Sequence, residues 1–127
     1  PAISADRLFI RATTAARSWR GQLLEAEERA KAGAPAFVYQ LNWCDAAHMD
    51  DIPLVFGTTT DKADFPVRDA MIGALLRFAR TGDPGWAPYR LPERGTMIFD
   101  AISRLEMSPR AFERELFARV LYLQPGS

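Results

Sequence analysis

The chain has 127 residues, of which 48% are hydrophobic and 25% are charged, as in one ordinary globular domain. Sixteen basic and sixteen acidic residues cancel, so the charge favours neither nucleic acid nor a membrane surface as a partner. No apolar run approaches the roughly 18 residues of a membrane span, and the first residues lack the basic start and apolar stretch of a signal peptide.

The first part of the chain predicts a long helix and a strand. Apolar residues three and four apart form one stripe of a helix that starts near Ser4 or Asp6 and stops near Gly33, with a break or bend expected at Gly21. The stripe consists of Leu8, Ala12, Ala15, Trp19, Leu23, Ala26 and Ala30. Residues 36–43 are rich in β-forming residues and apolar on both faces, which predicts a buried strand and favours parallel pairing. A loop follows over residues 44–51, and Pro53 argues against a central strand at 52–57.

The second part predicts two more helices and two short strands. A helix opens at Asp64 or Phe65 and ends at Gly82. Its expected buried face consists of Val67, Ala70, Met71, Ala74, Leu75 and Phe78. Strands are predicted at 96–99 and 104–107. A final helix starts at Pro109, and its expected apolar face consists of Phe112, Leu116, Val120 and Leu121. The fold class is α/β, with helices packed on a few strands of an incomplete sheet.

The only histidine, His48, lies in the predicted loop just past the end of the buried strand. In open α/β sheets ligands bind outside the carboxyl ends of the strands. An imidazole there exchanges protons readily near neutral pH, because its unperturbed pKa is about 6.5. From position alone, a solvated loop histidine without a functional role is the more common case. His48 is therefore the candidate catalytic residue, and its position leaves both interpretations open.

Other chemistry around His48 has less support. Asp45, Asp50 and Asp51 offer carboxylates for a metal site, but no second His or Cys lies at a ligand spacing, so we predict neither a metal nor a cofactor. Cys44 fits better as a small buried residue beside the strand than as the thiolate partner of His48.

A serine nucleophile is not found in the chain. None of the five serines lies in the G-x-S-x-G pattern that places a hydroxyl on a sharp strand-to-helix turn. These are Ser4, Ser18, Ser103, Ser108 and Ser127. No glycine-rich oxyanion loop or phosphate-binding loop is present either.

Several segments, in order, resemble the C-terminal part of type-B carboxylesterases of the α/β-hydrolase superfamily, such as para-nitrobenzyl esterases. The matching segments are DRLF at 6–9, VYQLNW at 38–43, AAHMDDIPLVFG at 46–57, LRFARTGDP at 76–84, WAPY at 86–89 and TMIFD at 96–100. They are similar to the family's D-x-x-F helix start, Y-x-F-x-W strand, histidine segment, F-A-R-T-G-D-P motif, W-P-x-Y motif and late strand. The loop before His48 is shorter than is usual in the family, and Asp45 stands where relatives often have glycine.

The resemblance implies an esterase function for residues 1–127 as the C-terminal segment of a single carboxylesterase domain. His48 would be the general base of a Ser-Glu/Asp-His triad, and Asp51 would fix the loop. The family's chain order is Ser, then Asp or Glu, then His, so the nucleophile and the acid would precede this segment. The chain alone should then be inactive on its ester substrate, and should pair with an N-terminal chain of the same protein or self-associate. The alternative is a non-catalytic α+β interaction module of esterase ancestry.

Overall fold

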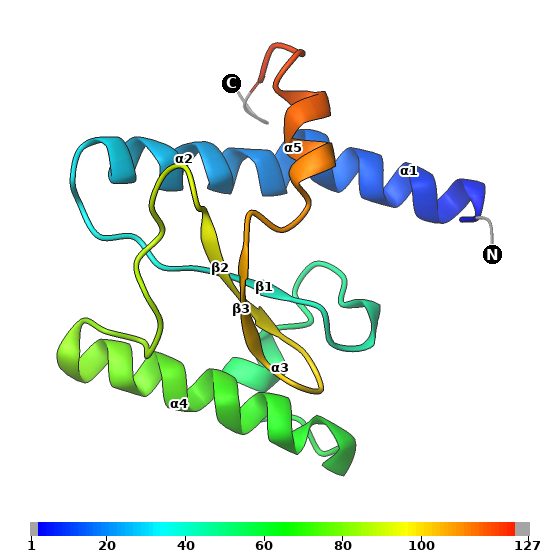
Figure 1. Cartoon of the computed structure of the whole chain (residues 1–127). Coiled ribbons are helices and arrows are strands. Elements are labelled where there is room, and N and C mark those ends of the chain that lie inside the picture. Colours follow the sequence, from blue (N-terminus) through cyan, green and yellow to red (C-terminus); the bar gives the residue numbers. More distant parts are fainter. Residues whose placement is uncertain (1–2, 124–127) are drawn as a thin grey trace.

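The computed structural model describes residues 3–123, and Figure 1 shows three strands lying between two groups of helices. The helices are α1 (Ala5–Thr14), α2 (Arg20–Lys31), α3 (Ile52–Val55), α4 (Phe65–Thr81) and α5 (Ala111–Phe117). The strands are β1 (Val38–Leu41), β2 (Gly95–Phe99) and β3 (Arg104–Met107). Within this part of the chain, no helix combines the length and the hydropathy needed to cross a membrane.

The predicted long helix is present as α1 and α2, joined by a π-helical segment at Ala15–Trp19, and it runs along one side of the sheet (Figure 1). Ser4 is its N-cap, and the Ser4 hydroxyl accepts a hydrogen bond from the backbone N–H of Arg7 at 3.3 Å. Of the break or bend expected at Gly21, the break is wrong, because α2 passes through this residue. Gly21 instead leaves room for Tyr122, whose hydroxyl would overlap a Cβ at this position.

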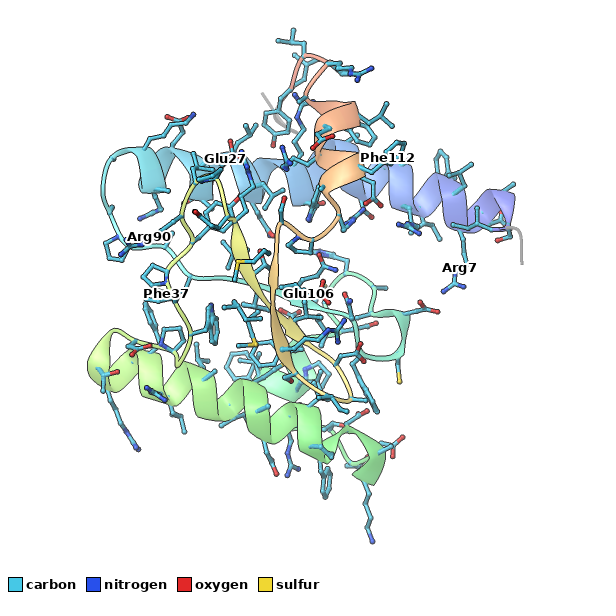
Figure 2. All side chains as sticks on the ribbon, viewed as in Figure 1. Arg7, Glu27, Phe37, Arg90, Glu106 and Phe112 are labelled. Atoms are coloured by element: carbon cyan, nitrogen blue, oxygen red, sulfur yellow. The ribbon has the colours of Figure 1, made fainter. Side chains whose placement is uncertain are left out.

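The sheet has the order β1-β2-β3. β1 pairs with β2 in parallel, with Val38 opposite Thr96, and β2 and β3 form an antiparallel hairpin. The predicted parallel pairing and the predicted hairpin are therefore both confirmed. The burial predicted for the first strand is wrong: β1 lies at one edge of the sheet, none of its residues is buried, and Tyr39 is 44% exposed. An ion pair of 3.0 Å between Glu27 on α2 and Arg94, just before β2, joins the long helix to the sheet. Figure 2 shows Glu27 on α2, near the N-terminal end of β2.

Helix α4 covers the other side of the sheet. It has Pro66 in its first turn and ends at Gly82, which adopts the left-handed conformation with φ 75°, as the sequence predicted. The core on this side consists of Leu54, Val67, Met71 and Phe99, with Leu41, Trp43, Val55, Ala74, Trp86 and Met97 packed around it.

The expected buried face of α4 is wrong at three positions. Leu75 is 50% exposed and Phe78 is 45% exposed, and Ala70 is exposed as well. Val67 and Met71 are the two buried residues of α4, because they lie on the part of the helix that reaches α3 and β2. Ala74 packs at the margin of the core, whereas Leu75, Leu76 and Phe78 are only half covered by the described part of the chain.

The last helix also differs from the prediction. α5 ends at Phe117, so Val120 and Leu121 lie beyond it, and Phe112 is 76% exposed. The apolar face expected for this helix is therefore not buried. Figure 2 shows Phe112 on α5 beside the long helix.

Candidate functional site

The chain turns sharply at the carboxyl end of β1. Trp43–Asp45 form a 3-10 turn in which Cys44 (φ 52°) and Asp45 (φ 55°) adopt the left-handed conformation. This conformation favours glycine over residues that carry a Cβ. The turn takes Cys44 out of the sheet and leaves it exposed, so the prediction of a buried cysteine is wrong.

His48 lies in a second tight turn directly after the first. The backbone N–H of Ala47 donates to the Asp50 carboxylate at 2.8 Å, and the N–H of Asp50 donates to the Ala47 carbonyl at 3.3 Å. His48 and Met49 lie between these two residues, and both side chains are exposed. Within residues 3–123 no group hydrogen-bonds to the imidazole, and none of the four serines in this range is its partner. The imidazole is thus exposed to solvent on this turn.

The three aspartates near His48 each have their own partner. Arg7 on α1 forms an exposed ion pair with Asp45, and Figure 2 shows Arg7 extending from the helix. Asp50 closes the histidine turn, as described above. Tyr39 on β1 donates its hydroxyl proton to Asp51 at 3.2 Å. Among the described residues no three His, Cys, Asp or Glu side chains converge as metal ligands.

Burial and the nearby charge of Asp51 both raise the pKa of Tyr39. The phenol of Tyr39 therefore remains protonated and available as a donor. The family resemblance implies that Asp51 fixes the loop. Asp51 directly precedes α3, and its hydrogen bond with Tyr39 joins this point of the chain to β1.

A further carboxylate, Asp64, was not found as a site residue from the sequence. Asp64 accepts hydrogen bonds from the Trp43 indole N–H at 2.9 Å and from the Thr59 hydroxyl at 2.6 Å. The bond from Thr59 and then that from Trp43 lower the pKa of Asp64. In the sequence, Asp64 is recognisable only as a residue at the start of a helix. Its partners Trp43 and Thr59 lie 21 and 5 residues away, and no local pattern indicates them.

A small open cavity of about 240 Å³ lies at the base of these turns. Its lining residues are Leu41, Trp43, Cys44, Asp50, Pro53, Leu54 and Asp64. This volume is below the 300 to 1,000 Å³ that is typical of small-molecule sites, and His48 is not among the lining residues.

Comparison with solved structures identifies the class of fold. The chain matches the carboxylesterase EST55 of Geobacillus stearothermophilus with a TM-score of 0.78 and 26% identity, over 92% of this chain and 29% of that one. It matches a PNB esterase with a TM-score of 0.79 and 24% identity, over 91% of this chain and 28% of that one. An esterase from anaerobic Clostridium hathewayi that can hydrolyse aliphatic aromatic polyesters matches with a TM-score of 0.60 and 24% identity, over 72% of this chain and 22% of that one.

These matches define the class of the protein: the chain has the fold of the C-terminal part of an α/β-hydrolase. More particularly, the structures that it resembles are carboxylesterases, as the sequence motifs predicted. The chain spans less than a third of the length of these relatives. No family model matches the chain.

Proposed function

We propose that this chain supplies the general-base histidine of a serine carboxylesterase that hydrolyses carboxylic esters. The observation that carries the proposal is the position of the only histidine, His48, exposed on a tight turn past the carboxyl end of β1, in a fold similar to that of carboxylesterases. His48 would accept the proton of the nucleophilic serine as the serine attacks the ester carbonyl. It would then return this proton to the departing alkoxide. The serine, the triad acid and the oxyanion donors would come from the N-terminal part of the enzyme.

The edges of the sheet support an N-terminal polypeptide of the same enzyme as the partner. Within residues 3–123, β1 has one neighbour in the sheet, and its residues, Val38–Leu41, carry no charge. β3, at the opposite edge, carries Arg104 and Glu106, which form an ion pair of 2.6 Å. Charged residues protect a sheet edge against further pairing, and an uncharged edge is open to it. We therefore propose that a strand of the N-terminal part pairs with the free edge of β1.

The exposed part of α4 is consistent with such a partner. Leu75, Leu76 and Phe78 are all about half exposed, although they lie on a helix that packs against the sheet. Burial of this surface would be favourable by the hydrophobic effect. Self-association of the chain is the alternative means of covering it.

The proposal is tested on the native protein. The intact mass and the copurifying polypeptides are measured first, and the hydrolysis of a short-chain p-nitrophenyl ester follows. We expect a companion or longer polypeptide with a G-x-S-x-G serine, and a loss of kcat on the order of 10⁴-fold or more in His48→Ala. The control is Arg80→Ala, which changes an exposed residue near the end of α4 and should leave kcat unchanged.

Two results would contradict the proposal. One is a single species of this chain's own mass without esterase turnover, which would favour the non-catalytic interaction module. The other is an active esterase complex in which His48→Ala retains the kcat of the Arg80→Ala control.

A further inference from the structure

The segment that carries His48 is held at both ends by one carboxylate. Trp43, at the start of the segment, donates its indole N–H to one oxygen of Asp64 at 2.9 Å. Thr59, after α3, donates its hydroxyl proton to the other oxygen at 2.6 Å. Residues 43–59 therefore form a loop that is closed at its base by Asp64. His48 lies inside this loop, and within residues 3–123 it makes no hydrogen bond to the carboxylate.

Asp64 itself lies at the start of a helix that is packed into the core. It directly precedes α4, whose residues Val67 and Met71 are buried in the core, and its side chain makes no hydrogen bond to the first turn of this helix. Both oxygens are thus free to bond to the loop. The negative charge also lies at the N-terminal end of α4, where the helix dipole is favourable to an anion.

Leu54 of α3 joins the loop to the core, and the other polar connections of the loop are weaker than those to Asp64. The Arg7–Asp45 ion pair is exposed on both sides, and such surface pairs contribute little because water screens them. The hydrogen bond between Tyr39 and Asp51 has a distance of 3.2 Å, which is longer than the roughly 2.5 to 3.0 Å usual for an O–H···O bond. The two bonds to Asp64 are shorter than the bond between Tyr39 and Asp51, and unlike the Arg7–Asp45 pair they are partly buried.

We propose that Asp64 is a positioning residue that fixes the location and the mobility of the His48 turn by closing the base of residues 43–59. Its role in catalysis rests on the proposed function, in which His48 is the general base. The effect of Asp64 on the mobility of the His48 turn does not depend on catalysis, and it can be measured in this chain without a substrate.

The test compares Asp64→Ala with Asp69→Ala, which removes an exposed carboxylate from the surface of α4. Since His48 is the only histidine, its imidazole signals in NMR spectra need no assignment. In Asp64→Ala we expect these signals to shift, and the amides of Ala46, Asp50 and Ile52 to exchange with solvent about tenfold faster, because the base of the loop opens locally. In Asp69→Ala the imidazole signals of His48 and the exchange rates of these amides should remain as in the unchanged protein.

Further variants separate a local effect from general destabilisation. The amides of α4 should keep their exchange rates in Asp64→Ala, and Asp64→Asn, which keeps one carbonyl acceptor, should restore part of the protection. If Asp64→Ala does not fold, the double variant Trp43→Phe/Thr59→Val removes the two donors and leaves the carboxylate in place. Unchanged His48 signals and unchanged loop exchange in a folded variant would overturn the proposal.

The consequence for catalysis is tested in the native esterase complex. We expect Asp64→Ala to lower kcat more than it raises KM, with partial rescue by Asp64→Asn. Full kcat in Asp64→Ala, with His48→Ala inactive, would overturn the positioning role and leave the proposed function intact. Full activity in His48→Ala would overturn the proposed function instead.

Discussion

Arg11, in the last turn of α1, donates a hydrogen bond of 2.7 Å to Glu113 of α5, across 102 residues of the chain. Arg110 donates to the same carboxylate oxygen at 3.1 Å, and its guanidinium lies 4.4 Å from the ring centroid of Trp19. Charged and aromatic contacts therefore join α5 to the long helix, in place of the apolar face that the sequence predicted.

Loss of the Glu113 charge should destabilise the contact between α5 and α1. The side chain is only 18% exposed and accepts two charge-assisted hydrogen bonds, so Glu113→Gln should lower the free energy of unfolding by about 1 to 2 kcal/mol. Urea denaturation measures this change. Glu115→Gln, at an exposed position next to Arg114, is the control and should change the free energy by less than about 0.5 kcal/mol. Equal effects of the two substitutions would contradict this role of Glu113.

The stability of the protein should fall in acid because of two carboxylates. Burial alone would raise the pKa of Glu113, but the hydrogen bonds from Arg110 and Arg11 outweigh it and hold this pKa below its ordinary value of 4.5. The bonds from Thr59 and Trp43 hold the pKa of Asp64 below 3.8.

A carboxyl group with a lowered pKa in the folded state stabilises the protein above its ordinary pKa, and this stabilisation is lost as the pH falls through the folded-state value. We therefore expect the urea midpoint to decrease progressively below about pH 4.5. The variant Asp64→Asn/Glu113→Gln should show a flatter dependence in this range. An equally steep decrease in the double variant would assign the acid sensitivity to other groups.

Two helical glycines should respond in opposite ways to alanine. A Cβ at Gly73 in α4 meets nothing within 4 Å, so Gly73→Ala should increase stability by about 0.5 to 1 kcal/mol through helix propensity. Gly21→Ala should lower the melting temperature, because the new Cβ displaces Tyr122 from its place near the Arg20 guanidinium. Thermal unfolding followed by circular dichroism measures both changes. An increase for Gly21→Ala equal to that for Gly73→Ala would show that Tyr122 moves without cost.

The central strand should be sensitive to truncation at Ile98. This residue is fully buried, on the opposite face of β2 from Phe99, so Ile98→Ala should cost about 2 to 5 kcal/mol of unfolding free energy. Ile102 in the hairpin turn is 79% exposed and provides the matched control, with an expected change below about 0.5 kcal/mol. A small effect of Ile98→Ala would mean that Ile98 is not buried in this way in solution.

The sequence predicted the boundaries of a helix well where residues at those boundaries determine the backbone conformation. Pro66 and Gly82 determine where α4 begins and ends, because one restricts φ and the other accepts a positive φ. The half-exposed state of Leu75 and Phe78 could not be predicted from periodicity. It depends on which segments pack against α4, and the periodicity of the helix does not contain this information. The same holds for Gly21, whose role depends on Tyr122 at the other end of the chain.

The candidate site shows the same division. The motif around His48 predicted a loop histidine past a parallel strand, and the structure confirms this position. The role of His48 as a general base stays a prediction. The bonds of Asp64 to Trp43 and Thr59 arise only when α4 returns to the end of β1, and no residue spacing indicates them.

The parallel pairing of β1 with β2 has a consequence for the order of folding. The two strands pair in register from Val38 with Thr96, so residues 42–94, including the His48 turn and α4, form one large loop between them. The β2–β3 hairpin needs only contacts between neighbouring segments and should form early, whereas closure of the large loop is slow. During this interval the backbone N–H and C=O groups of β2 that face β1 have no partner, and the apolar side chains of Ile98 and Phe99 lie on the two faces of the same strand. A newly made chain should therefore be most prone to aggregate before β1 pairs with β2.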